Sequence, residues 1–206
     1  MRYAITEGCD EMITTVSKRI SLYLLANDVI TAEEAEVCQY GLEIMLSTLL
    51  GTMIVLLIGA LLGVFCLSIF YCAVFVLLRQ LTGGYHADTY FKCNLLSGLL
   101  SFAVLGLTRI LSTYGLYSWG LHLLLILFSV LTIAAYAPLD NPNKTLNRSQ
   151  KTRNRILSIV SSLLLSAVSC ILFNTHPAVT ILTGLTLFLT TLLILIGKIK
   201  RKENES

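Results

Sequence analysis

Charged side chains are scarce in this chain of 206 residues: only 13% are Asp, Glu, Lys or Arg, whereas soluble domains carry about 25%. They are absent from two long segments. Residues 44–78 form 35 consecutive positions without a formal charge, and residues 156–197 form 42 that contain only the weakly basic His176. One spanning helix needs about 20 apolar residues, so each segment can cross a membrane twice. These absences exclude a soluble domain and indicate a polytopic, all-α membrane protein.

Other missing patterns exclude further classes of protein. The six cysteines lack CxxC or metal-type spacing, and three of them (Cys66, Cys72 and Cys170) lie in apolar segments, so no disulfide framework is expected. The three histidines are scattered, so we expect no metal and no cofactor. The first 40 residues lack a basic start followed by a short apolar core, so no cleavable signal peptide is expected. A net charge of +3 is too small and too scattered to indicate a nucleic acid partner.

Breaks in the apolar segments predict about six spans. Gly59 to Gly63 divides the first segment, Pro138 ends the fourth span, and residues 174–177 form a turn in the last segment. The expected spans are 44–61, 64–78, 94–109 or slightly beyond, 117–137, 156–173 and 178–197. We expect one integral membrane domain over 1–206. It would comprise an N-terminal interfacial helical region (1–42), a six-span bundle (43–197) and a basic tail (198–206).

The distribution of Lys and Arg predicts the orientation in the lipid bilayer. With the N-terminus inside, 14 of the 15 basic residues are cytoplasmic. Only Arg109 lies outside, where its long side chain can reach the interface. His122 is also expected at the outer interface. Both termini would then face the cytoplasm in a multi-pass protein of the cell membrane.

The first 40 residues predict two helices. An apolar stripe recurs at three- and four-residue intervals and is formed by Ile13, Val16, Ile20 and Tyr23. The sequence from Thr31 to Glu34 has the form of a capping box, which predicts a second helix that continues into the first span. The first helix is either a surface helix on the bilayer or a lid or docking surface for a partner.

The segment 79–93 carries more reactive side chains than a connector between two spans needs. His86 and Cys93 are seven residues apart, a spacing that would place both on one face of a helix. This pair is the minimum for a thiol nucleophile, because the imidazole takes the thiol proton. Gly83 and Gly84 permit close backbone approach, and N–H groups there could receive an oxyanion.

Each of these residues also has a structural interpretation. Paired glycines often mark a turn, a single histidine at the interface often contacts headgroups, and a cysteine at the start of a span is often a packing residue. Arg79 either binds a substrate carboxylate or marks the cytoplasmic boundary. Asp88 is a weaker candidate for orienting His86, because a helical offset of two places it on another face.

The pattern Arg79-x3-Gly83-Gly84-x-His86-Ala-x5-Cys93 resembles the signature of the accessory gene regulator B (AgrB) family, membrane cysteine endopeptidases of Gram-positive quorum sensing. A second element, Pro138-Leu-Asp140-Asn-Pro-Asn143-Lys144, is similar to the family's Pro-x-Asp-x-x-Asn-Lys sequence after the fourth span. The length, the number of spans and the basic loop also fit. The resemblance therefore covers nearly the whole chain.

The resemblance implies cleavage of the C-terminal part of an AgrD-type propeptide through a cysteine acyl-enzyme, with cyclisation to a thiolactone or lactone autoinducing peptide. It implies that His86 is the general base, that Cys93 is the nucleophile, and that the site is supported by Arg79, Gly83 and Gly84. The second element would bind peptide or support the structure through Asp140, Asn143 and Lys144. The family also implies a homodimer in a Gram-positive cell membrane, with its active site at the cytoplasmic face.

Two other functions remain open on the sequence. A small membrane peptide transporter or exporter fits six spans and a basic cytoplasmic face. However, the spans contain no Asp, Glu or Lys, and no GxxxxGK[ST] loop is present. A structural or assembly factor without chemistry is the third alternative. The basic loop 144–155 either sets the orientation and contacts anionic lipid, or steers an acidic precursor tail.

Overall fold

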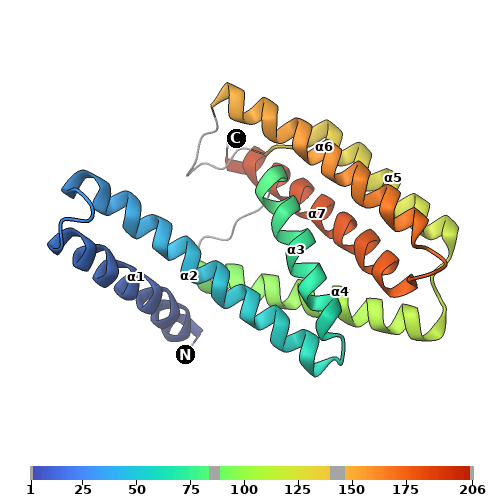
Figure 1. The fold of residues 1–206 in the computed structure, drawn as a ribbon, viewed down its shortest axis with the longest axis horizontal. Coiled ribbons are helices and arrows are strands. Elements are labelled where there is room, and N and C mark those ends of the chain that lie inside the picture. The colour runs from blue at the N-terminus through green and yellow to red at the C-terminus, as the bar shows by residue number, and fades with distance from the viewer. Residues whose placement is uncertain (1, 84–88, 140–146, 205–206) are drawn as a thin grey trace. The chain divides into compact units, whose positions relative to one another are not determined.

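The computed structural model describes residues 2–83, 89–139 and 147–204, and within these ranges the regular structure is helical (Figure 1). Six described helices, α2 to α7, are long and apolar enough to cross a membrane. This confirms the prediction of a polytopic, all-α membrane protein. The helices are α1 (Arg2–Ala26), α2 (Ala32–Leu61), α3 (Phe65–Thr82), α4 (Tyr90–Tyr114), α5 (Trp119–Tyr136), α6 (Arg148–Ile171) and α7 (Pro177–Asn204).

The helices end where the sequence predicts turns, but some are longer than their apolar segments. Gly63, with a φ of 67°, lies in the turn between α2 and α3, and Pro177 is the first residue of α7. The start of α6 lies well before residue 156, because Asn147 and Gln150 form a reciprocal capping box. Polar capping therefore extends a helix beyond the part that a bilayer would cover.

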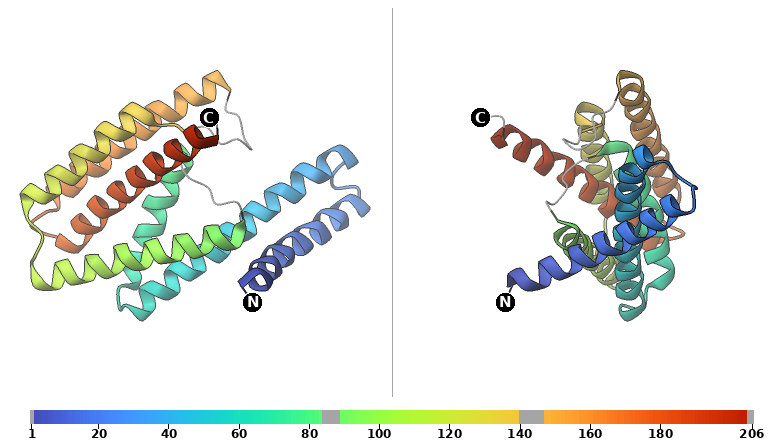
Figure 2. Two further views of the ribbon diagram at one scale, coloured as in Figure 1. Left: turned by 180° about the vertical axis from the view of Figure 1, so that it is seen from behind. Right: turned by 90° about the vertical axis from the view of Figure 1, so that its left-hand side faces the viewer.

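Contacts divide the chain into two compact units, unit 1 (residues 1–55 and 87–99) and unit 2 (residues 56–86 and 100–206). In unit 1, α1 and the first part of α2 lie side by side and run antiparallel (Figure 2). The predicted capping box is confirmed: the Thr31 N–H donates to Glu34 Oε2 at 2.9 Å, and the Glu34 N–H donates to Thr31 Oγ1 at 3.3 Å. Ser21 Oγ ties the two helices together by donating to the Ala35 carbonyl at 2.7 Å.

The apolar stripe predicted on α1 lies mostly on the outside of unit 1. Val16, Ile20 and Tyr23 are exposed, and only Ile13 of the stripe is buried. The side of α1 that is buried also carries small hydroxyl side chains, among them Ser17. Small side chains let two helices approach closely, so the apolar residues are left for other contacts.

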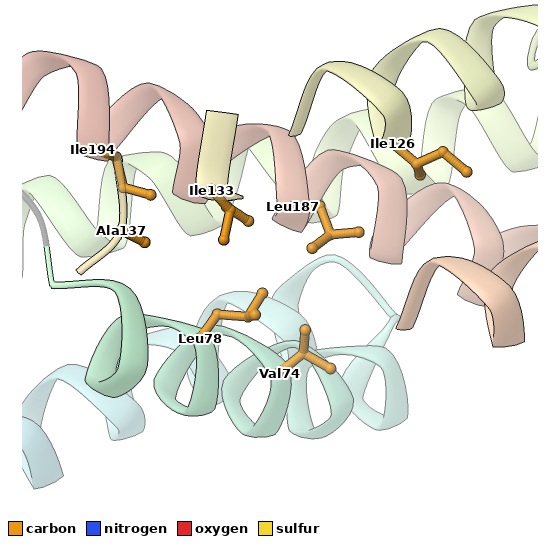
Figure 3. Packing of buried hydrophobic residues seen from close by; sticks show 7 residues of the cluster. All are labelled: Val74, Leu78, Ile126, Ile133, Ala137, Leu187 and Ile194. Atoms are coloured by element: carbon orange, nitrogen blue, oxygen red, sulfur yellow. The ribbon is translucent and has the colours of Figure 1, made fainter. Parts of the chain in front are cut away.

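In unit 2, α7 is the central helix and packs against α3, α5 and α6. Of the most apolar 18-residue stretch of α7, 67% is buried, compared with 17–28% of the corresponding stretches of the other spans. Figure 3 shows the core at this junction, where side chains of α3, α5 and α7 meet. Its members are Val74, Leu78, Ile126, Ile133, Ala137, Leu187 and Ile194.

The buried face of α6 consists of hydroxyl side chains, whereas its apolar residues, such as Leu163 and Leu164, are exposed. This arrangement inverts the pattern of a helix in a soluble protein and suits contact with lipid. Each buried hydroxyl donates to a carbonyl of its own helix at 2.7–2.9 Å. The four residues are Ser158, Ser162, Ser166 and Ser169.

His122 is fully buried, so it packs inside unit 2 and does not make the interface contact that the sequence suggested. Its Nδ1 lies 3.0 Å from Tyr117 Oη, and its Nε2 lies 3.1 Å from Ser169 Oγ. Because the Ser169 hydroxyl donates to the Ser166 carbonyl, it accepts from Nε2–H, and Nδ1 is hydrogen-bonded to the Tyr117 hydroxyl. Burial raises the pKa of Tyr117, which keeps the phenol protonated. The His122 imidazole therefore joins α5 to α6.

Candidate active site

The first motif begins at the C-terminal end of α3, where Arg79 and Gly83 close the helix. The Gly83 N–H donates to the Arg79 carbonyl at 3.1 Å, and Arg79 Nη1 donates back to the Gly83 carbonyl at 2.8 Å. A cation in the last turn also interacts favourably with the helix dipole. Arg79 is thus a capping residue in addition to a residue at the end of a span.

The second motif lies directly against the first within unit 2. Leu139, which follows Pro138, pairs with Gly83 in an isolated parallel bridge, and its N–H donates to the Thr82 carbonyl at 2.9 Å. Gly83 has a φ of 67°, and a Cβ on it would collide with the Leu139 carbonyl oxygen. Only glycine combines this backbone conformation with so close an approach. The two motifs, 56 positions apart in the sequence, therefore begin side by side.

Basic residues from α6 and α7 hold the end of α5, just before the second motif. Arg155 Nη2 donates to the Ala134 carbonyl at 3.4 Å, and Lys198 Nζ lies 3.7 Å above the centre of the Tyr136 ring. Cations at a helix C-terminus satisfy its free carbonyls and complement its dipole. From the sequence, Arg155 was expected to set the orientation and contact lipid or to steer a precursor, and no local pattern indicates its contact with the end of α5.

Cys93 lies in the first turn of α4, in unit 1, and is half-buried. Thr89 precedes the helix as its cap: its Oγ1 accepts from the Lys92 N–H at 3.2 Å, and its carbonyl accepts from the Cys93 N–H at 3.0 Å. The prediction of a single helix carrying both His86 and Cys93 is therefore wrong, because α4 begins only at Tyr90. The helix that carries Cys93 therefore does not extend back past Thr89, and His86 lies outside the described residues.

Two acidic residues near Cys93 went unnoticed in the sequence. The Phe91 N–H donates to Asp10 Oδ1 at 2.9 Å, and Tyr90 Oη donates to Glu43 Oε2 at 3.0 Å. Both pairs join residues far apart in the sequence, and no local pattern indicates such contacts. Asn94 is buried and donates to Ser47 Oγ at 3.3 Å.

The remaining predicted site residues lie outside the described ranges: Gly84, His86, Asp88, Asp140, Asn143 and Lys144. The structure brings together Arg79, Gly83 and Leu139, and it places Cys93 at a helix N-terminus. Among the residues that it describes, no group of three or more His, Cys, Asp or Glu side chains could hold a metal ion.

Comparison with known proteins gives a family for the chain. Residues 17–196 match the family described as Accessory gene regulator B. "Putative AgrB-like protein 1" of Clostridium perfringens is 27% identical over 182 residues, which cover 87% of this chain and 94% of that protein. "Putative AgrB-like protein" of Clostridium beijerinckii is 27% identical over 73% of each chain. No solved structure matches this chain. With a match that spans most of its length, and with both motifs in place, the chain belongs to the accessory gene regulator B family.

Proposed function

We propose that this protein is a membrane cysteine endopeptidase that cleaves an AgrD-type propeptide and promotes cyclisation of the product. The observation that carries the proposal is the pairing of Gly83 with Leu139, because it joins the two motifs of the family at one place. Cys93, the proposed nucleophile, is the last residue of the first motif and lies in the first turn of a helix. Backbone N–H groups at a helix N-terminus favour negative charge, which suits a thiolate nucleophile.

The proposed reaction starts with His86 taking the proton of the Cys93 thiol. The thiolate sulfur attacks a peptide carbonyl near the C-terminal part of the precursor, and the carbonyl oxygen becomes an oxyanion. When the oxyanion collapses, the C–N bond breaks, and His86 returns its proton to the leaving amine. The N-terminal part of the precursor remains on Cys93 as a thioester.

The thioester can then be resolved in two ways. Attack by a thiol or hydroxyl of the precursor forms a thiolactone or lactone and breaks the acyl C–S bond, so Cys93 leaves as a thiolate and the proton of the attacking group returns to it through His86. Attack by water instead gives a linear peptide. Exchange of a thioester for a thiolactone is nearly neutral in energy, so cyclisation needs exclusion of water and placement of the internal nucleophile. A site at the edge of a helix bundle, partly below the lipid headgroups, meets both needs.

The proposal includes an orientation and partners. Both termini and the site would face the cytoplasm, since 14 of the 15 basic residues then lie on that side. Basic residues near the second motif, including Lys151 and Arg155, would attract an acidic precursor tail. A homodimer in the bilayer completes the proposal.

The test is co-expression with an AgrD-type precursor, followed by mass spectrometry of the products and of the intact protein. Wild type should release the C-terminal fragment and carry a precursor adduct on Cys93, and Cys93→Ala and His86→Ala should do neither. Cys38→Ala is the matched control, because this half-buried cysteine of α2 lies outside both motifs. Equal processing by wild type and Cys93→Ala would contradict the proposal. Export of an uncleaved peptide by both would favour a transporter instead.

A further inference from the structure

The first turn of α4 is held by a carboxylate from a distant part of unit 1. The Phe91 N–H donates to Asp10 Oδ1 of α1, although the two residues are 81 positions apart. The first N–H groups of a helix have no partner within the helix, and a carboxylate there is favoured by the helix dipole. Thr89 satisfies the N–H groups of Lys92 and Cys93, but the Phe91 N–H receives its acceptor from α1.

Helix α2 holds the start of α4 at two further points. Tyr90 Oη donates to Glu43 Oε2 at 3.0 Å, and the buried Asn94 donates to Ser47 Oγ at 3.3 Å. The residues that α1 and α2 contact therefore lie on both sides of Cys93. Among these contacts, only that of Asp10 is made to a backbone group of α4. It therefore holds the main chain of the first turn, whereas the other two hold side chains.

Resting on the proposed function, we infer that Asp10 is a positioning residue for the Cys93 thiol. By accepting from the Phe91 N–H, Asp10 fixes the position and orientation of the first turn of α4, which carries the Cys93 sulfur. A fixed negative charge repels a thiolate, so the charge of Asp10 does not activate the nucleophile. What Asp10 supplies is an acceptor oxygen at a fixed place. Helix α1 is thus part of the support of the site, beyond the surface, lid or docking roles considered from the sequence.

The variants Asp10→Asn and Asp10→Ala separate geometry from charge. Asparagine keeps an acceptor oxygen at the same distance and removes the charge, whereas alanine removes both. Glu11→Ala is the matched control, because it deletes a carboxylate from the exposed neighbouring position. Full-length protein in membranes is treated with N-ethylmaleimide, and labelling of the peptide containing Cys93 is followed by mass spectrometry. Half-buried Cys38 serves as the internal reference for unfolding.

In Asp10→Ala, Cys93 should be alkylated faster because the turn loosens, while Cys38 should be labelled at the wild-type rate. Processing of the precursor should fall by about tenfold or more in kcat at similar KM, since small displacements of a reacting group are costly. Asp10→Asn and Glu11→Ala should stay close to wild type in both measurements.

Two outcomes would overturn the inference: Asp10→Ala behaving like Glu11→Ala, or Asp10→Asn being as impaired as Asp10→Ala. If Asp10→Ala does not accumulate in membranes, Asp10→Glu replaces it, because it keeps the charge and moves the oxygens by one methylene. Impairment of Asp10→Glu with retention in Asp10→Asn supports positioning, and the reverse contradicts it. Alkylation needs no precursor, so this inference and the proposed peptidase activity can fail separately.

Discussion

The backbone N–H of Leu139 donates to the carbonyl oxygen of Thr82 at 2.9 Å, so the chain that leaves α5 is pinned to the last turn of α3. Thr82 is itself buried, and its hydroxyl donates to the Leu78 carbonyl at 2.8 Å. Leu139 is thus held against a buried part of α3. A change that separates Leu139 from the end of α3 should affect both motifs at once.

Replacing Gly83 with alanine should disrupt this contact. The added Cβ would collide with the Leu139 carbonyl oxygen, and the positive φ would be strained, which costs about 1–3 kcal/mol. We expect a lower unfolding temperature in detergent and loss of precursor processing. Gly106→Ala is the control, because its Cβ meets nothing within 4 Å. If the two variants unfold at the same temperature, the close approach at Gly83 has no energetic importance.

Replacing His122 with alanine should destabilise unit 2 without removing a reactive group. The variant loses the bonds to Tyr117 and Ser169 and leaves a cavity, for a cost of about 2–3 kcal/mol. His176→Ala is the matched control, since this histidine is exposed. Thermal unfolding measures the effect. An unchanged midpoint in His122→Ala would show that the hydrogen-bonded chain contributes nothing to stability.

Replacing Gly184 with alanine tests the same network from α7. A Cβ at this position would lie 2.7 Å from Tyr117 Oη and 3.1 Å from His122 Nδ1, so the phenol would have to move. We expect destabilisation of about 1–3 kcal/mol, as for other overpacked positions, measured by thermal unfolding. Gly120→Ala has open space around its Cβ and should unfold like wild type. Equal stability of the two variants would contradict this arrangement.

Replacing Thr31 with alanine should fray the start of α2. The variant loses Thr31 Oγ1, which accepts from the Glu34 N–H alongside the Thr31 carbonyl, and a lost N-cap costs about 0.5–2 kcal/mol. Hydrogen exchange should speed up at residues 32–35. The control is Thr48→Ala, because Thr48 is exposed and donates only to the Ile44 carbonyl of its own helix. Unchanged exchange at Glu34 would exclude a capping role for Thr31.

The local features of this fold could be predicted from the sequence, because a span or a cap depends on residues close together in the chain. The six spans, the turn at Gly63 and the capping box at Thr31 are confirmed in this way. The expected helix through His86 and Cys93 fails because a seven-residue spacing does not say where a helix begins, and α4 begins only after Thr89.

Contacts between distant segments could not be predicted, since they depend on how helices pack. From the sequence, His122 was expected at the interface, because its contact with Ser169 depends on how the helices pack. Asp10 was not singled out, because its contact with Phe91 joins residues 81 positions apart. Arg109 was expected to reach for the interface, and its guanidinium also donates to the Leu62 carbonyl in the turn after α2. In the candidate site, the sequence therefore predicts residue types, while packing determines their supports.

The serine hydroxyls that line the buried side of α6 donate to carbonyls of α6 itself, and most buried threonines of α7 do the same within α7. A helix of this kind can enter lipid before its neighbours arrive, because it carries few donors that await a partner. Biogenesis can then proceed helix by helix, with assembly following insertion. Close packing between small side chains then determines which helices associate.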